Sequence, residues 1–128
     1  MASAKTILEA EIYGALAASI AGATVYQDVP ENEPFPIVMI GEMRSQPLGA
    51  KDDSDRRITV TIVALASAEE RAPVLALMEQ IETALDKSRF AAGGWTFGGT
   101  FIDDEAALAE DGTSYVGSVV FEFLALKD

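Results

Sequence analysis

The amino-acid sequence predicts an α+β fold, an antiparallel sheet of four to five strands with two helices packed on one face. Two stretches repeat apolar residues at the spacing of a helical face, and five shorter stretches have the alternation or apolar runs of strands. Glycine, proline and acidic turn residues separate these stretches. The predicted order is α-β-β-β-α-β-β, which suits helices laid on one face of an antiparallel sheet.

Length and charge restrict the class of protein. The chain has 128 residues, and we expect one domain over residues 1–128 that buries roughly 65–70 % of its unfolded surface. Its net charge is −12, from 21 acids against 9 Lys and Arg, which argues against binding to nucleic-acid phosphates or anionic membranes. Cysteine, a signal peptide and an apolar run of 18 residues are all missing from the sequence. We therefore expect a cytoplasmic protein.

The first helix is predicted over residues 4–21. Ser3 or Thr6 can cap its start, and Gly22 follows its last periodic residue as a stop. The apolar stripe has a spacing of four residues and consists of Leu8, Ile12, Leu16 and Ile20.

Three strands are predicted next, over residues 23–27, 37–43 and 56–66. Pro34 and Pro36 favour an extended entry into the second of them, because proline fixes φ and biases its predecessor away from helix. The third strand alternates apolar with polar residues, so one of its faces is expected to be buried. Residues 45–54 are predicted to form a flexible loop.

A second helix and two strands complete the prediction. Ser67 with Glu70 resembles a capping box, although Pro73 suggests that the regular helix begins near Ala72. Strands are expected over residues 95–103 and 113–126, with a turn at 110–112. The buried face of the last strand is predicted to carry Tyr115, Gly117, Val119, Phe121 and Phe123.

Catalytic chemistry has few candidates in this chain. Histidine and cysteine are both absent, which removes the common general base and the common nucleophile pairs. Two acidic clusters could hold Ca²⁺ or Mg²⁺ through oxygen ligands, but their spacing does not match a calcium loop, and solvated acids are the simpler interpretation. These clusters are Asp52, Asp53 and Asp55, and Asp103, Asp104 and Glu105.

Glycine pairs surround the single tryptophan. Gly93-Gly94 and Gly98-Gly99 enter and interrupt a strand rather than open a helix, so bulges or close backbone approach are expected in place of a phosphate site. Trp95 has no basic groove beside it and is expected in the core or in a subunit contact.

Basic residues gather around the loop at residues 45–55. Arg44, Lys51, Arg56 and Arg57 can simply balance the neighbouring aspartates, each exposed pair contributing about 0–1 kcal/mol. Alternatively the loop, with Leu48 at its apolar tip, becomes ordered against a neighbouring subunit. The sequence leaves both possibilities open.

The segment VYQDVPENEPFPIVMIGE at residues 25–42 resembles the small tail-completion or tail-terminator proteins of long-tailed phages and gene transfer agents. The resemblance rests on Val25-Tyr26, Asp28-Val29-Pro30, Pro34-Phe35-Pro36 and the apolar residues 37–40, in that order after an N-terminal helix. Later elements continue it over nearly the whole chain. One departure is Val116, where similar proteins often carry histidine.

The resemblance implies a structural virion protein rather than an enzyme, with no cofactor and no metal. Such proteins form a hexameric ring that caps the tail tube, ends its polymerisation and meets the head connector, while DNA passes unbound through the lumen. The expected location is the head-proximal end of the tail, after assembly in the host cytoplasm. Alternatives are another interaction module of the head–tail joint and, less favoured, a divalent-metal-binding domain.

The ring implies two sets of residues. The subunit-interface candidates are Leu48, Lys51, Arg56, Arg57 and Trp95. The candidates for negative charge on the lumen wall are Asp52, Asp53, Asp103 and Asp104, which would repel the phosphate backbone of DNA.

Overall fold

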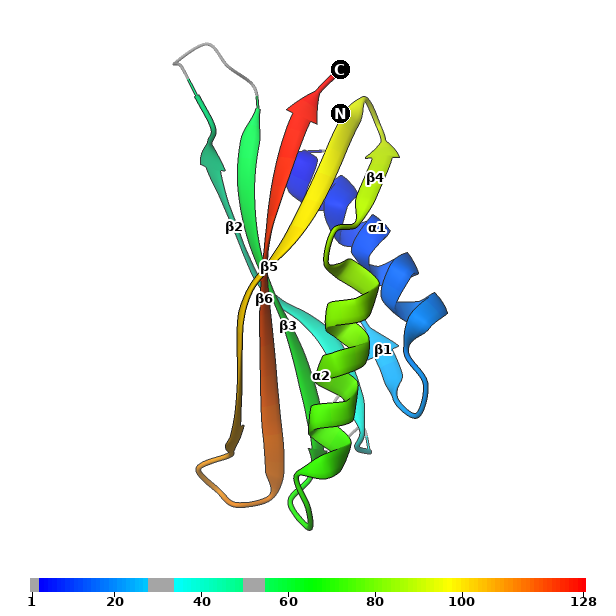
Figure 1. Ribbon diagram of the computed structural model, residues 1–128, viewed down its shortest axis with the longest axis vertical. Coiled ribbons are helices and arrows are strands. Elements are labelled where there is room, and N and C mark those ends of the chain that lie inside the picture. Colours follow the sequence, from blue (N-terminus) through cyan, green and yellow to red (C-terminus); the bar gives the residue numbers. More distant parts are fainter. Residues whose placement is uncertain (1–2, 28–33, 50–54) are drawn as a thin grey trace.

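The computed structural model describes residues 3–27, 34–49 and 55–128 and contains two helices on one side of a strongly twisted sheet (Figure 1). The helices are α1 (Ala4–Ser19) and α2 (Ala72–Leu85). The strands are β1 (Thr24–Tyr26), β2 (Ile37–Pro47), β3 (Arg56–Ser67), β4 (Arg89–Ala92), β5 (Trp95–Leu108) and β6 (Ser114–Lys127). Their order across the sheet is β1-β2-β3-β6-β5-β4.

The α+β class and the one-sided helices agree with the prediction, but the predicted sheet is wrong in two respects. It has six strands instead of four or five, because Arg89–Ala92 forms the short strand β4 against the start of β5. It is also mixed, since β1 pairs with β2 in parallel. The turn between β4 and β5 uses Gly93 and Gly94, whose φ angles of 58° and 84° suit glycine.

The first helix begins as predicted and ends slightly earlier. The Ser3 hydroxyl accepts a hydrogen bond from the Thr6 N–H at 3.2 Å, which caps the helix. Leu8, Ile12 and Leu16 of the predicted stripe are buried, whereas Ile20 lies after the helix and is half-buried. The helix stops at Ser19 with an extended Ile20 as its C-cap, so Gly22 (φ 85°) belongs to the turn into β1 and is not the helix stop.

The second helix contradicts the capping-box prediction. Ser67 is the last residue of β3, and its hydroxyl accepts only a long 3.4 Å hydrogen bond from the Glu69 N–H. Helix α2 starts at Ala72, and the side chain of its N-cap residue Arg71 makes no capping hydrogen bond. Pro73 fits there because the first turn of a helix needs no N–H partner. The start near Ala72 is therefore confirmed and the box is wrong.

Strands β2 and β5 are clearly longer than predicted, whereas β3 is longer by one residue and β6 is shifted by one residue. Strand β2 continues to Pro47, so the predicted loop from residue 45 begins too early, and residues 50–54 lie outside the described part of the chain. Strand β5 continues to Leu108 after a bulge at Ile102, where the register with β6 shifts. A bulge inserts an extra residue and breaks the alternation, which explains why the sequence pattern predicted an earlier end.

The core lies between the helices and the inward side of these strands. Ile58, Val60 and Ile62 of β3 are fully buried, as are Val119, Phe121 and Phe123 of β6. Each fully buried side chain of this size stabilises the fold by roughly 1.5–3 kcal/mol. Gly117 is also buried. Glycine fits there because a Cβ would lie 2.6 Å from the Met78 sulfur of α2. Of the predicted face, only Tyr115 is half-buried.

Candidate functional site: the helix-free face of the sheet

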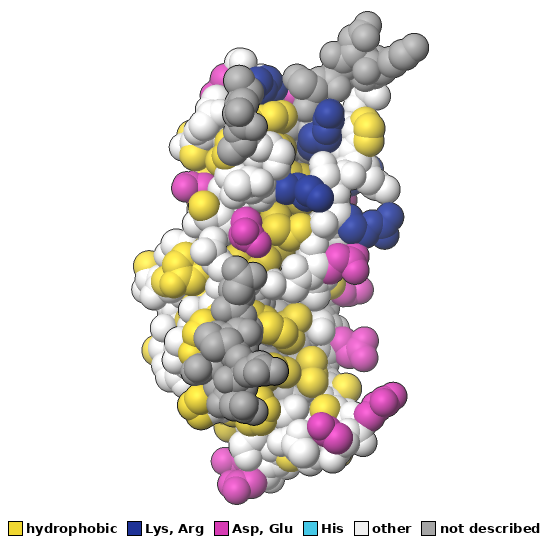
Figure 2. Space-filling view, turned by 180° about the vertical axis from the view of Figure 1, so that it is seen from behind, with side chains coloured by type: hydrophobic (Ala, Val, Ile, Leu, Met, Phe, Trp, Pro, Cys, Tyr) yellow, Lys and Arg dark blue, Asp and Glu magenta, His cyan; other side chains and the backbone are white. Residues whose placement is uncertain are grey.

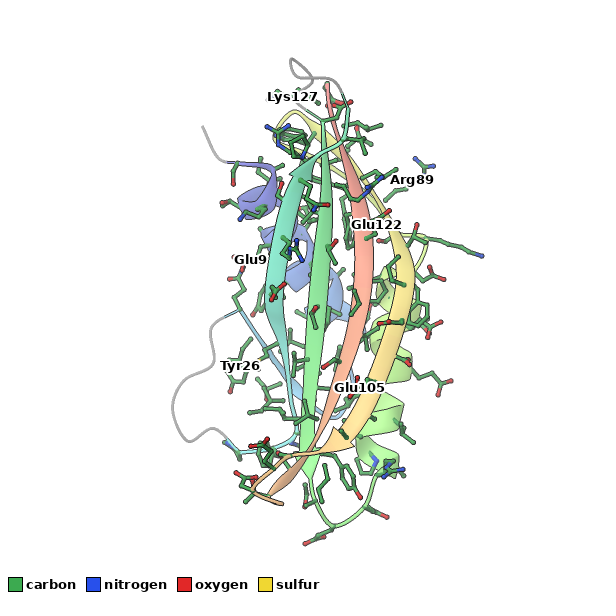
Figure 3. The ribbon with its side chains drawn as sticks, turned by 90° about the vertical axis from the view of Figure 1, so that its left-hand side faces the viewer. Glu9, Tyr26, Arg89, Glu105, Glu122 and Lys127 are labelled. Carbon is green, nitrogen blue, oxygen red and sulfur yellow. The ribbon has the colours of Figure 1, made fainter. Side chains whose placement is uncertain are left out.

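The face of the sheet opposite the helices, here called the helix-free face, faces the viewer in Figure 3. Its side chains alternate along each strand with those of the core and are exposed or half-buried. On strands β2, β3, β6 and β5, the outward side chains are mainly polar or charged in the half of the sheet where β6 ends. They include Arg44, Gln46, Arg57, Thr59, Thr100, Glu122 and Leu124.

Cations are distributed unevenly along the strands. Of the eight Lys and Arg residues that the structure describes, seven lie at the end of the molecule where β6 finishes, and Arg71 lies at the other end. Figure 2 shows the visible Lys and Arg side chains in the upper half of its view, with most Asp and Glu below them along the right margin. This cation-rich end, here called the basic end, also holds acids that include Asp55, Glu122 and Asp128.

Two predicted interface residues bind groups of their own chain. Arg57 forms an ion pair with Glu122, with 3.5 Å between Nε and Oε2. Arg56 donates from Nη1 to the Asp55 carbonyl at 3.0 Å. An exposed ion pair contributes about 0–1 kcal/mol, so Arg57 can turn to a neighbouring molecule at small cost. Arg56 is half-buried and has further interactions within its own chain.

The other interface candidates differ in exposure. Leu48 is half-buried, and its N–H donates to the Asp55 carbonyl at 3.1 Å. Trp95 is 7 % exposed and belongs to the core, where its ring lies 6.4 Å from the ring of Phe97. The Lys127 ammonium lies 4.9 Å from the centre of the Trp95 ring. Because Trp95 is buried in its own subunit, the structure supports the core alternative for this residue. Lys51 lies outside the described residues.

The acidic candidates are exposed where they are described. Asp103 and Asp104 project from β5 beside Glu105, whereas Asp52 and Asp53 lie outside the described residues. Strand alternation sends Asp103 and Glu105 to the helix-free face and Asp104 to the opposite one, so the three carboxylates do not share one face. Within residues 3–27, 34–49 and 55–128, no group of three or more acids is placed to hold a metal ion.

Five surface hollows lined by described residues each hold at most one carboxylate. One of about 560 Å³ beside α2 is lined by Ser19, Ala76, Glu79, Gln80, Thr83 and Ala84. Hydrogen bonds from the Thr113 N–H at 3.0 Å and its hydroxyl at 2.8 Å lower the pKa of Asp111, an exposed turn residue. That pKa shift comes from the turn and not from a cleft in which a substrate could bind.

The described residues form a small α+β fold with a packed core and an open sheet face that is cation-rich at one end. The sequence matches the model of the family "tail completion protein gp17" over residues 11–125, and the chain belongs to that family. The resemblance drawn from the sequence is thereby confirmed.

A solved structure has the same fold. A chain in the "virion of native gene transfer agent (GTA) particle" is similar with a TM-score of 0.82 and 20 % identity, covering 98 % of both chains. At this level of identity the likeness shows the fold alone. No curated protein matches the sequence. None of the helices in the described part of the chain has the length and hydropathy needed to cross a membrane.

Sequence reasoning missed part of the basic end. Lys5, Lys87, Arg89 and Lys127 come from three separate regions of the chain and join Arg44, Arg56 and Arg57 only in the folded sheet. Their individual positions carry no pattern. The pairing of β4 with the start of β5, and of β6 with β3, brings the strand residues together, and packing of α1 against the sheet adds Lys5.

Proposed function

We propose that this protein is a structural component of a phage-type tail that closes into a hexameric ring. The ring caps the tail tube, ends tube polymerisation and joins the tail to the head connector at the head-proximal end, after assembly in the host cytoplasm. Family membership over residues 11–125 is the observation that carries this proposal. The fold shared with a chain of a gene transfer agent virion is compatible with it.

The role requires no turnover. The described residues offer shallow hollows and, at residues 103–105, carboxylates that do not share one face, and histidine and cysteine are absent from the sequence. Function then depends on shape and charge. Seven of the eight described cations lie at one end of the subunit, and this asymmetry suits a ring that meets a different partner on each side, the tube protein and the connector.

Passage of DNA depends on repulsion. Asp103 and Glu105 of β5 are exposed on the helix-free face, Asp104 is exposed on the opposite face, and the whole chain carries −12. An acidic lumen wall keeps the phosphate backbone at a distance, so that DNA passes without being trapped. Asp52 and Asp53 lie outside the described residues and remain candidates for the same role.

The ring is tested by the mass of the native protein. Six chains of 13.6 kDa give an assembly of about 82 kDa. We expect native mass spectrometry to find this species either in the pure protein or after incubation with purified tails, and negative-stain images to show an annulus. A protein that stays monomeric at high concentration and joins neither tails nor connectors contradicts the proposal.

Replacing Leu48 by aspartate is expected to impair ring formation without unfolding the subunit. Leu48 is half-buried next to the end of β2, so a charge there opposes docking of a neighbour but touches no core residue. The control is Leu75→Asp on α2, where the leucine is 46 % exposed. Native mass and circular dichroism are measured for both variants, and intact rings in Leu48→Asp would remove Leu48 from the contact.

A further inference from the structure

Two strand segments at opposite sides of the sheet have an open hydrogen-bonding edge. Strand β1 pairs with β2 only over Ile37–Met39, so Met43–Pro47 of β2 has β3 as its sole strand neighbour among the described residues. Strand β4 pairs with β5 only over Trp95–Gly98, which leaves Asp103–Leu108 open in the same way, within the described part. Unpaired backbone groups on such edges can pair with another chain.

The β2 edge is not sealed by the helix beside it. A hollow of about 240 Å³, lined by Lys5, Thr6, Glu9, Gly41 and Met43, separates the start of α1 from β2. Residues 44–47 are all exposed. An extended segment could therefore approach this edge without moving α1.

The two open edges carry opposite charges. Arg44 is exposed on the β2 segment, and Asp103, Asp104 and Glu105 are exposed on the β5 segment. Arg44 and Glu105 have no ion-pair partner within the described residues. Ile102 and Leu108, about half exposed at 49 % and 51 %, add apolar surface on either side of the acids.

Strand directions favour joining these edges between copies. Strands β2, β3, β6 and β5 are each antiparallel to the next, so β5 runs opposite to β2. When two copies stand side by side in the same orientation, the β5 edge of one therefore meets the β2 edge of the next in antiparallel fashion. Antiparallel pairing is the slightly more stable arrangement, and because the two edges differ, it can continue around a ring.

Charge and face orientation select one register. Arg44 and Gln46 project from the helix-free face, as do Glu105 and Asp103. Pairing residues must share a face, so Arg44 opposite Glu105 places Gln46 opposite Asp103. This register puts a cation directly across from an anion.

The same register has a geometry suited to a closed ring. Arg44 lies level with Glu122 of β6 and Glu105 lies level with Ser118, four residues away along that strand. The stagger between these two levels is about 13 Å along the strands, and the width of the four strands from β2 to β5 is about 19 Å. These lengths correspond to a strand tilt of about 35°, within the range that closed barrels adopt.

We propose that neighbouring copies join by pairing Met43–Pro47 of β2 in one copy with the Asp103–Leu108 segment of β5 in the next, with Arg44 opposite Glu105. This inference rests on the ring formation proposed above and names the surfaces that form it. Figure 3 shows Glu105 in the lower part of the sheet, well separated from the basic end that includes Arg89 and Lys127. Copies of a chain with charge −12 repel one another over most of their surface, and this junction is where opposite signs meet.

Protection of the edges against aggregation explains only part of these observations. Charged residues and Pro47 do blunt open strands, and they would do so with either sign at either edge. Protection does not require one edge to be basic and the other acidic. Sorting by sign is what a junction between unlike edges needs.

Charge reversal tests the junction. Arg44→Glu places two carboxylates opposite each other and is expected to weaken association about tenfold or more, measured by sedimentation velocity or native mass. Arg44→Glu combined with Glu105→Arg restores an opposite pair and should recover association. The matched control is Arg71→Glu, which makes the same change in net charge. Arg71 is the N-cap of α2, at the opposite end of the molecule, so this variant should leave association unchanged.

The absence of cysteine allows an independent geometric test. Arg44→Cys with Glu105→Cys in one chain should give, on mild oxidation, a ladder of disulfide-linked multimers on non-reducing gels. Arg44→Cys with Glu79→Cys, whose second cysteine lies on exposed α2, should give no ladder.

The outcomes separate this junction from the ring itself. Wild-type rings that resist charge reversal, together with no ladder from the Arg44–Glu105 cysteine pair, overturn the junction and leave the ring standing. A wild-type chain that stays monomeric both alone and with tails overturns the ring and with it the junction. Retention on DNA at physiological salt that is lost in Arg44→Glu would make phosphate the occupant of the β2 edge and also overturn the junction.

Discussion

Replacing Phe121 by alanine is expected to lower the free energy of unfolding by roughly 3–5 kcal/mol. Phe121 is 0 % exposed in the middle of β6. Its ring centroid lies 6.2 Å from that of Phe101 and 6.4 Å from that of Phe123, so truncation leaves a cavity lined by two aromatic rings. Domains of this size have only about 5–15 kcal/mol of stability, and the loss should be large in a urea or thermal denaturation curve.

The matched control on the same strand is Leu124→Ala. Leu124 lies on the helix-free face and is 40 % exposed, so removing its side chain leaves no cavity in the core. We expect a change within about 1 kcal/mol. Similar losses of unfolding free energy in the two variants would contradict the burial of Phe121 and the exposure of Leu124.

Gly99→Ala is expected to destabilise the fold by roughly 1–3 kcal/mol through overpacking. A Cβ at Gly99 would lie 2.5 Å from Phe123 Cε2 and 2.8 Å from the Ser88 hydroxyl. The backbone cannot easily move away, because the Gly99 N–H donates to the Ser88 carbonyl at 2.9 Å and its carbonyl accepts from the Lys87 N–H at 3.0 Å. The glycine holds the segment after α2 against β5.

Gly98→Ala provides the control one residue away. A Cβ at Gly98 meets no heavy atom within 4 Å, and the φ angle of Gly98 is not positive. This variant should be neutral or slightly stabilising, by about 0.4–1 kcal/mol, since alanine reduces the freedom of the unfolded chain. Chemical denaturation of both variants checks the pair, and a Gly99→Ala protein as stable as Gly98→Ala would contradict the close packing of Phe123.

Periodic elements with strong local patterns were predicted well from the sequence. The stripe of α1, the stripe of α2 and the alternation of β3 each place apolar residues on one side, and burial of that side stabilises the element where the pattern predicts it. The turn at residues 110–112 was also predicted, and Gly112 adopts the positive φ of 71° that glycine tolerates. The apolar side chains of α1, α2 and β3 make up most of the core.

Elements stabilised by partners far along the chain were predicted poorly. The four residues of β4 form a strand because β5 folds back on them through Gly93 and Gly94. The parallel direction of β1 depends on where the chain re-enters the sheet before Ile37. Ser67 had the spacing of a capping box, but pairing with Ser114 of β6 keeps it in β3.

The candidate site divides in the same way. Local composition determined that this chain has no histidine or thiol chemistry, that it carries a large negative charge, and that its motifs resemble the tail completion family to which it belongs. Only the tertiary structure decided that seven cations share one end and that Arg44 and Glu105 lie on open edges at opposite sides of the sheet. Strand order sets those positions, and it depends on long-range backbone pairing and burial that no local stretch of sequence encodes.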